Sequence, residues 1–228
     1  MSTVSLVTGG NRGIGREVCR QLAERGHTVL LTARSAEAAA TAARATGVSG
    51  TEPLRLDVTD PASIAVAARQ VGERHGRLDV LVNNAAIDYD TWQRAIDADL
   101  AVVREAAETN LYGPWLMVQR FLPLLRASDH PRIVNVSSEA ASLASMGGGT
   151  PAYTASKVAL NALTRMLAAE LRRDHVLVNA VCPGWPASEN HPDGRSITQA
   201  AASVIWAITI PNGGPTGTLT RDGQPYPW

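Results

Sequence analysis

The residues best suited to chemistry in this sequence are a tyrosine and a lysine four positions apart, Tyr153 and Lys157. Residues at this spacing share one face of a helix. The chain has 21 basic residues, and all of them except Lys157 are arginine. A compact ammonium kept at one place indicates a task that a planar guanidinium cannot perform. The alternative, a chance surface lysine beside a half-buried tyrosine, is less favoured.

Such a pair is suited to moving a proton to or from oxygen. A free phenol has a pKa of about 10, and a nearby positive charge favours the phenolate and lowers that pKa. Tyr153 could then protonate a carbonyl oxygen whose carbon receives a hydride, or accept the proton of an alcohol in the reverse direction. Ser137 and Ser138 both qualify as a second donor to the developing oxyanion. Either serine could instead be a cap at the end of a strand.

A glycine-rich stretch near the start of the chain is suited to binding a phosphate group. Thr8–Gly15 joins a strand-like run to a helix-like run and has glycine at 9, 10, 13 and 15. Glycine lets the backbone approach a pyrophosphate, and the amino end of the following helix presents N–H groups and a positive dipole end. We therefore interpret this stretch as a dinucleotide site, with a purely structural turn as the alternative.

The residues expected beside the adenosine ribose favour a phosphorylated dinucleotide. Folds that prefer NAD place Asp or Glu about 20 residues after the glycine-rich loop. Here that place has Arg34 and no acid, and Arg12 lies in the loop opposite. Two guanidinium groups can hold a 2′-phosphate. The sequence thus predicts NADP(H), unless both residues are ordinary surface arginines.

These residues must be positioned by elements that alternate along the chain. Predicted strands cover residues 4–8, 28–33, 53–57, 78–83, 132–138, 176–181 and 217–221, and predicted helices cover 13–25, 36–45, 61–75, 95–127, 152–174 and 196–208. Strands that are almost continuously apolar indicate a parallel sheet covered on both faces. We expect an α/β, Rossmann-type doubly wound, seven-stranded parallel sheet in a single domain, 1–228, with ligands at the carboxyl ends of the strands.

Several motifs occur in an order that resembles the short-chain dehydrogenase/reductase family, and in particular its carbonyl-reductase-like members. They are Val7–Gly15, Asn83-Asn84-Ala85-Ala86, Tyr153 with Lys157, and Pro183-Gly184, followed by a similar closing segment from Gly214 to Trp228. The resemblance covers essentially the whole chain. It implies a nicotinamide-dependent oxidoreductase with a small-molecule carbonyl or alcohol substrate. A homodimer, a homotetramer and a monomer are all compatible with it.

The resemblance also implies roles for further residues. Ser138 is favoured over Ser137 as the donor to the substrate oxygen, and Asn110 becomes a fourth catalytic residue at a helix kink that holds a relay water. Lys157 would also hold the nicotinamide ribose. Together with the charge argument, the expected cofactor-binding residues are Gly9, Asn11, Arg12, Gly13, Ile14, Gly15, Arg34, Asp57, Val58, Asn83, Ala85, Tyr153, Lys157, Pro183 and Gly184.

The sequence departs from the family pattern at three places. Ala86 replaces a usual glycine, and the stretch from Ser138 to Tyr153 is about two residues longer than typical. Pro186 replaces an aliphatic residue whose backbone N–H commonly meets the nicotinamide carboxamide, and proline has no N–H. Weak activity or an unusual substrate would follow. The short polar segment 189–195 predicts a small lid and broad specificity.

Composition excludes several other classes of protein. The chain has 228 residues, 45% of them hydrophobic and 18% charged, with zero formal net charge, which is typical of a globular protein and gives no reason to expect nucleic acid or a membrane as partner. The scattered histidines and two cysteines predict no metal site and a cytoplasmic location. The leading hypothesis is an NADPH-dependent carbonyl reductase. The alternatives are an alcohol dehydrogenase working oxidatively and a cofactor-binding regulator without turnover.

Overall fold

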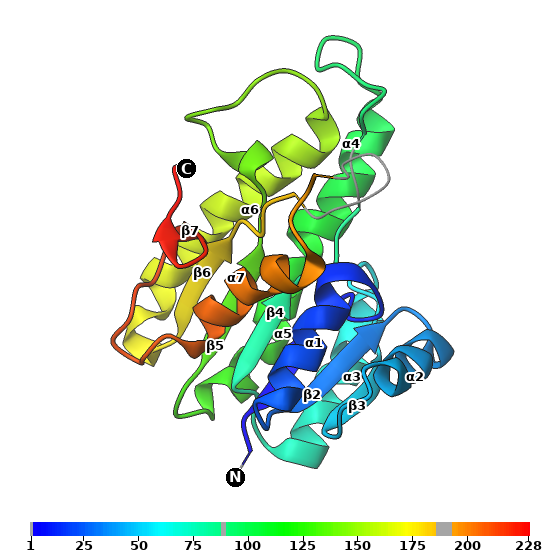
Figure 1. Cartoon of the computed structure of the whole chain (residues 1–228), viewed down its shortest axis with the longest axis vertical. Helices are drawn as coiled ribbons and strands as arrows, with labels where there is room; N and C mark the ends of the chain where they lie inside the picture. The colour runs from blue at the N-terminus through cyan, green and yellow to red at the C-terminus, as the bar shows by residue number, and fades with distance from the viewer. Residues whose placement is uncertain (1, 88–89, 186–192) are drawn as a thin grey trace.

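The computed structural model describes residues 2–87, 90–185 and 193–228, and its strands form one eight-stranded sheet (Figure 1). The strand order is β3-β2-β1-β4-β5-β6-β7-β8, and β8 is the antiparallel one. The strands are β1 (Val4–Val7), β2 (Thr28–Ala33), β3 (Thr51–Arg55), β4 (Val80–Asn83), β5 (Arg132–Val136), β6 (Leu177–Val181), β7 (Leu219–Arg221) and β8 (Gln224–Pro225).

The predicted doubly wound parallel sheet is confirmed, but the predicted count of seven strands is one too low. The two-residue β8 was missed because it adds only an edge pairing, Thr220 with Pro225 and Arg221 with Gln224. Asp222 and Gly223 make the reversal with positive φ values of 52° and 76°. An Asp-Gly pair with both φ positive is favoured in two-residue hairpin turns.

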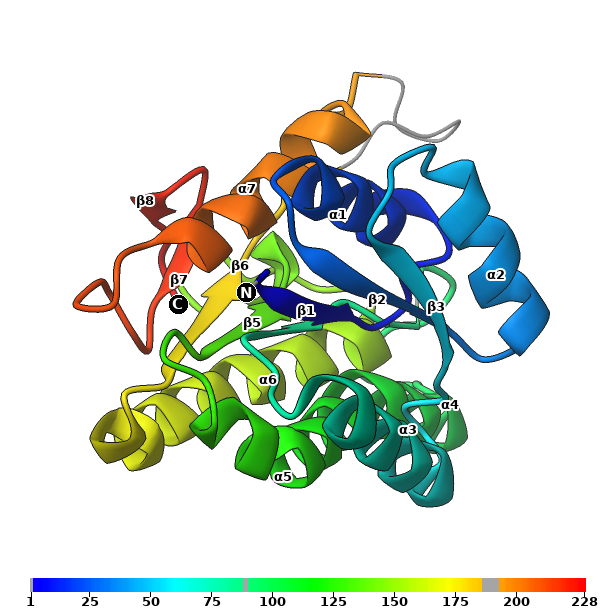
Figure 2. The same ribbon diagram turned by 90° about the horizontal axis from the view of Figure 1, so that it is seen from below.

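Helices cover both faces of the sheet (Figure 2). One face has α1 (Gly13–Glu24), α2 (Ala36–Ala45) and α7 (Ile197–Thr209), and the other has α3 (Pro61–His75), α4 (Leu100–Ala107), α5 (Gly113–Arg126) and α6 (Pro151–Glu170). Adjacent strand residues point to opposite faces, so Leu6 packs into the core on the α3, α5 and α6 side while Val7 packs on the α1 and α7 side. Two buried faces explain why the strands read as continuous apolar runs.

The predicted helix over 95–127 is wrong in its start and in its continuity. The helix begins at Leu100, where the Asp99 side chain caps it by accepting from the Ala101 N–H. A π-helical turn, η1 (Glu108–Tyr112), then separates α4 from α5. Pro114 has no N–H to donate to the carbonyl four residues earlier, which weakens the regular α-helical pattern at this point.

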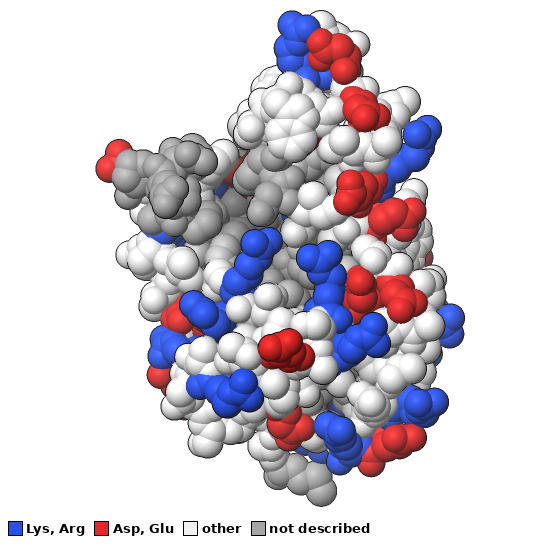
Figure 3. Space-filling model, turned by 90° about the vertical axis from the view of Figure 1, so that its right-hand side faces the viewer, with Lys and Arg blue, Asp and Glu red and all other residues white. Residues whose placement is uncertain are grey.

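The remaining helical segments are two 3₁₀ turns, η2 (Glu139–Ala141) after β5 and η3 (Leu171–Asp174) after α6. In the described ranges, no helix is long and apolar enough to cross a membrane. Acidic and basic side chains are interspersed over the face drawn in Figure 3, as expected from the balanced composition.

The strand order determines where the site lies. The chain goes from β1 outward to β2 and β3, then returns to β4 on the other side of β1. Adjacent connections therefore leave β1 and β4 toward opposite faces. In sheets of this kind the crevice at the carboxyl ends of the two strands is the place where ligands bind.

Candidate active site

The loops that follow β1 and β4 are joined by side-chain hydrogen bonds. The Asn84 side-chain amide donates to the carbonyl oxygens of Thr8 at 2.9 Å and Gly9 at 3.2 Å. In return, the Thr8 hydroxyl accepts from the backbone N–H groups of Asn84 at 2.9 Å and Ala85 at 3.0 Å. These four bonds hold the glycine-rich loop against the Asn83–Ala86 motif in one rigid unit.

Glycine is required at two positions of this unit for steric reasons. A Cβ on Gly15 would lie 2.4 Å from the Gly9 carbonyl oxygen, and a Cβ on Gly9 would lie 3.0 Å from the Ala85 Cα. Gly9 also has a positive φ of +63°. Gly13 has φ of +53° but nothing within 4 Å of its Cβ position. The residue before α1, Arg12, does not cap the helix with its side chain. A helix amino end beside this glycine-rich loop fits a pyrophosphate.

The two arginines expected near the ribose are both exposed. Arg12 precedes α1 and Arg34 follows β2, so they stand at neighbouring places on the carboxyl edge of the sheet. The Arg34 carbonyl oxygen accepts from Arg55 Nε at 3.3 Å, which ties the ends of β2 and β3 together. After β3, the Asp57 carboxylate accepts from both the backbone and the hydroxyl of Thr59, and Val58 is buried.

Tyr153 and Lys157 lie on one face of α6, as the spacing predicted, and both are buried, with 8% and 2% of their surface exposed. The Lys157 ammonium donates to the Val136 carbonyl oxygen at 2.8 Å and lies 5.6 Å from the centre of the Tyr153 ring. Because Val136 ends β5, this bond joins α6 to the strand that leads into Ser138. The ammonium therefore stands between the tyrosine and the strand end.

The two candidate serines have different surroundings. The Ser137 hydroxyl donates to the Asn161 side-chain oxygen at 2.7 Å, inside the contact between β5 and α6. The Ser138 hydroxyl oxygen accepts from the Ala140 N–H at 3.2 Å and so caps η2. The Ser137 hydroxyl is thus engaged in packing the interior, which favours Ser138 as the serine of the site.

Asn110 lies in the π-helical turn and is fully buried. Its side-chain oxygen accepts from the Ile87 N–H at 2.8 Å, and its amide nitrogen donates to the Ser156 hydroxyl at 2.9 Å. Ser156 in turn donates to the Tyr153 carbonyl oxygen at 2.7 Å. A distortion of the helix was expected at Asn110, and π-helical turns are frequent at functional sites.

The Pro183-Gly184 motif follows β6 and is held by Arg195. The Arg195 guanidinium donates to the Pro183 carbonyl oxygen at 3.1 Å, and a Cβ on Gly184 would lie 2.7 Å from the Arg195 side chain. The departure noted at Pro186 lies outside the described residues. Ala86, the other substituted position, is the residue directly after Asn84 and Ala85, which bond to the glycine-rich loop. Across the described part of the chain, no group of three or more His, Cys, Asp and Glu side chains could hold a metal ion.

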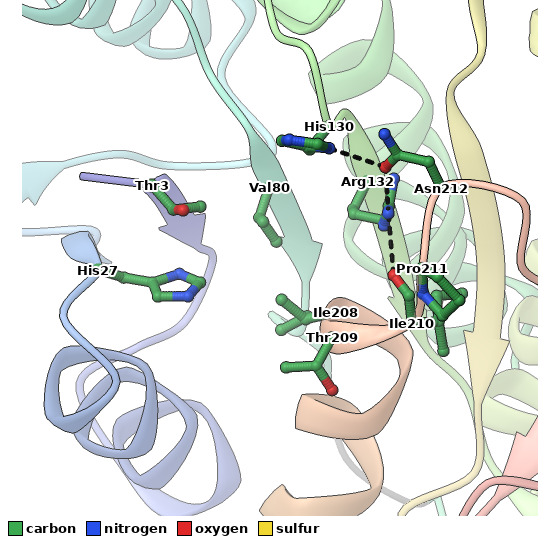
Figure 4. A pocket seen from close by; sticks show the side chains of 10 residues that line it. All are labelled: Thr3, His27, Val80, His130, Arg132, Ile208, Thr209, Ile210, Pro211 and Asn212. Atoms are coloured by element: carbon green, nitrogen blue, oxygen red, sulfur yellow. Dashed lines mark hydrogen bonds between the residues drawn. The ribbon is translucent and has the colours of Figure 1, made fainter. Parts of the chain in front are cut away.

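A separate cavity of about 460 Å³ lies at the opposite, amino edge of the sheet (Figure 4). Arg132 lines it and donates to the Ile210 carbonyl oxygen at 2.9 Å and to the Asn212 side chain at 2.8 Å (Figure 4). Ile210 is the residue after α7, where a cation interacts favourably with the carbonyl groups of the helix end. The cavity is thus remote from Tyr153, and its arginine completes a helix terminus.

Sequence reasoning missed one buried residue of this region, Asp90. It lies between β4 and α4 with 2% of its surface exposed, and its carboxylate accepts from the backbone N–H groups of Ala152 and Tyr153. An acidic residue in a loop after a strand carries no local pattern that reports such a contact. Only the packing of that loop against α6 reveals it.

Comparison with known proteins identifies the family of this chain. Residues 3–195 match the model of the short chain dehydrogenases. The chain belongs to the short-chain dehydrogenase family. A (+)-neomenthol dehydrogenase of Arabidopsis thaliana is 34% identical to this short-chain dehydrogenase, over 91% of this chain and 92% of the relative. Family membership confirms the resemblance inferred from the motifs.

Solved structures of other short-chain dehydrogenases share the fold. The NADPH-bound carbonyl reductase from chicken fatty liver is 28% identical, with a TM-score of 0.87 over 100% of this chain and 99% of that one. The RhlG/NADP active-site complex of Pseudomonas aeruginosa is 30% identical, with a TM-score of 0.87 over 97% and 95% of the two chains. The carbonyl reductase has NADPH bound, and RhlG is in complex with NADP.

Proposed function

We propose that this short-chain dehydrogenase reduces an aldehyde or ketone to an alcohol with NADPH. The observation that carries the proposal is the buried Tyr153–Lys157 pair at the carboxyl edge of the sheet, bonded to the end of β5 beside Ser138. A buried phenol next to a fixed ammonium is suited to giving a proton to an oxyanion. The relatives that carry names of reductases and dehydrogenases support the same reaction class.

The roles of the protein groups follow from their positions. The nicotinamide, when bound, supplies the hydride that is added to the carbonyl carbon. Ser138 donates a hydrogen bond to the substrate oxygen, and Tyr153 transfers its proton to that oxygen as negative charge develops there. Lys157 stabilises the resulting phenolate. The Asn110 side chain bonds to the Ile87 backbone and to Ser156, whose hydroxyl donates to the Tyr153 carbonyl oxygen, and we assign Asn110 the ordering of a relay water.

The cofactor site is proposed along the carboxyl edge of the sheet. The amino end of α1 and the glycine-rich loop would bind the pyrophosphate, and the exposed Arg12 and Arg34 would bind a 2′-phosphate. The remaining proposed contacts come from the ends of β3, β4 and β6, namely Asp57, Val58, Asn83, Ala85, Pro183 and Gly184. The NADP and NADPH complexes of the two structural relatives support this choice of cofactor.

The decisive test is the oxidation of NADPH and NADH in the presence of a panel of activated aldehydes and ketones. We expect turnover with NADPH, and a fall in kcat of about 10²–10⁴-fold in Tyr153→Phe, the range that a positioned acid contributes. Tyr112→Phe is the matched control, because that residue is 50% exposed whereas Tyr153 is buried.

Two other outcomes would change the proposal. NADPH binding without turnover on any member of the panel would favour a cofactor-binding regulator. Turnover confined to alcohols with NADP⁺ would favour a dehydrogenase working oxidatively with the same residues.

A further inference from the structure

The amino end of α6, which carries Tyr153, lacks the capping group that helices usually have. The residue before the helix, Thr150, has a left-handed backbone with φ of 44°, and its side chain makes no capping bond. This conformation is strained for a β-branched residue. Pro151 has no N–H, so the N–H groups of Ala152 and Tyr153 are the first two that need an acceptor.

Asp90 supplies both acceptors from another part of the chain. Its Oδ2 accepts from the Ala152 N–H at 2.9 Å, and its Oδ1 accepts from the Tyr153 N–H at 3.1 Å. The carboxylate is almost completely buried, and a negative charge at a helix amino end is stabilised by the helix dipole. One carboxylate thus bonds directly to the backbone of the residue proposed as the acid.

A second residue braces Asp90 in this position. Gln93 is also buried, and its side-chain amide donates to Asp90 Oδ2 at 3.1 Å while its side-chain oxygen accepts from the Asp99 N–H at 2.7 Å. Asp99 caps α4 through the Ala101 N–H. A continuous chain of hydrogen bonds therefore joins the amino ends of α4 and α6, and α4 leads directly into the turn that carries Asn110.

We infer that Asp90 is a positioning residue for catalysis, which fixes the amino end of α6 and with it the Tyr153 phenol. This inference rests on the proposed function, because it concerns the placement of the acid in that reaction. A displacement of about 1 Å in a reacting group can lower a rate by about 10²-fold. Lys157 lies one turn further along α6 and has its own bond to β5, so the loss of Asp90 displaces the tyrosine relative to the ammonium.

The test compares Asp90→Ala with Asp60→Ala. Asp60 caps α3 by accepting from the Ala62 N–H at 2.9 Å, so it is a capping aspartate on a helix without a proposed catalytic residue. Asp60→Ala should lower Tm by about 2–8 °C for a lost cap, and Asp90→Ala should lower it further because it leaves two buried N–H groups without an acceptor. Only Asp90→Ala should lose about 10²-fold in kcat, with KM for NADPH unchanged.

The conservative variant separates positioning from general stability. Asp90→Asn should recover part of the kcat lost in Asp90→Ala, because its single amide oxygen can still accept from one of the two N–H groups. If Asp90→Ala fails to fold, Asp90→Glu replaces it, since the longer side chain keeps the charge but shifts the cap. A kcat loss no larger than that of Asp60→Ala, in whichever of these variants folds, overturns the inference.

Amide hydrogen exchange keeps this test separate from that of the proposed function. In Asp90→Ala, the Ala152 and Tyr153 amides should exchange faster than in the wild type, while those of α3 should not. If the wild type has no turnover, the proposed function fails, and the placement of α6 by Asp90 is judged by this exchange alone. Unchanged protection of the two amides would overturn it.

Discussion

The role of Lys157 depends on both the charge and the shape of its side chain. In a chain that uses arginine at every other basic position, the one lysine is buried, bonded to a strand carbonyl and held over the Tyr153 ring. An ammonium is compact enough to make these contacts with 2% of the residue exposed. A guanidinium carries the same charge in a larger, planar group.

We therefore expect Lys157→Arg to lower kcat by about 10²-fold or more and to destabilise the fold by about 1–3 kcal/mol through overpacking. Carbonyl-dependent NADPH oxidation and denaturant unfolding would measure the two effects. Arg69→Lys, with a side chain 67% exposed on α3, is the control and should change neither quantity. A fully active Lys157→Arg would mean that charge alone is enough.

The preference for NADPH over NADH should also depend on a single residue, Arg34. Arg34→Asp should lower the affinity for NADPH by at least about 10-fold, because it removes a guanidinium from the proposed 2′-phosphate site and adds repulsion. Affinity for NADH should rise or stay constant, since an acid at this position can bind the ribose 2′-hydroxyl. Titration of both cofactors would measure this, with Arg69→Asp as control. Equal weakening for both cofactors would contradict the assignment.

At the scale of elements, the first residue of α5, directly after the π-helical turn, packs closely against the loop that follows β3. Gly113, the first residue of α5, packs so tightly that a Cβ would lie 2.9 Å from the Val58 carbonyl oxygen. Val58 is itself among the proposed cofactor contacts. The glycine thus allows the helix that follows Asn110 to approach the cofactor edge of the sheet.

Alanine substitution at two helical glycines should therefore have opposite effects. Gly113→Ala should destabilise the fold by about 1–3 kcal/mol because the backbone of Val58 cannot easily move away. Gly72→Ala should stabilise it by up to about 1 kcal/mol, since its Cβ would meet only Leu124 at 3.5 Å and alanine favours a helix. Denaturant unfolding of both variants tests this, and a neutral Gly113→Ala would show that the contact can relax.

At the scale of the whole molecule, α1 and α7 pack on one face of the sheet and are linked by polar contacts at their edge. The Gln21 side chain donates to the Thr198 carbonyl oxygen at 3.1 Å and to the Glu17 carboxylate at 3.0 Å. A hydrogen bond from Arg20 lowers the pKa of Glu17 to about 2. The ionised carboxylate therefore belongs to the folded state of this helix pair.

Because the pKa of Glu17 is lower in the folded chain than in the unfolded one, its stabilising effect is present above its ordinary pKa of 4.5 and is lost as the pH falls toward 2. Glu17→Gln should cost about 1 kcal/mol or less at pH 7, and the difference from wild type should shrink between pH 5 and about pH 2. Urea unfolding across this range measures it. Glu73→Gln, whose partner Arg69 is 67% exposed, is the control and should show a smaller difference at pH 7.

Local patterns were enough to predict most of this fold. Apolar runs of strand length, separated by helix-length stretches, indicated a parallel sheet covered on both faces, and the structure has that sheet. The spacing of Tyr153 and Lys157 indicated a shared helix face, which the structure also has. The eighth strand was missed because two residues of edge pairing leave no periodic pattern. The kink at Asn110 was expected from the family resemblance, but hydrophobic spacing within 95–127 did not indicate it, because η1 differs from its neighbours in hydrogen bonding.

The sequence by itself determined the fold class, because strand and helix patterns alternate along the chain. It also determined the glycine-rich loop and the residue types of the proposed site, because each of these is encoded in a short motif. Only the tertiary structure decided how the side chains are engaged. It directs the Ser137 hydroxyl to Asn161 and leaves Ser138 at the strand end, and it brings Asp90 to the Tyr153 amide across 63 residues. Hydrogen bonds between distant segments depend on how the loops pack, and no local pattern records that.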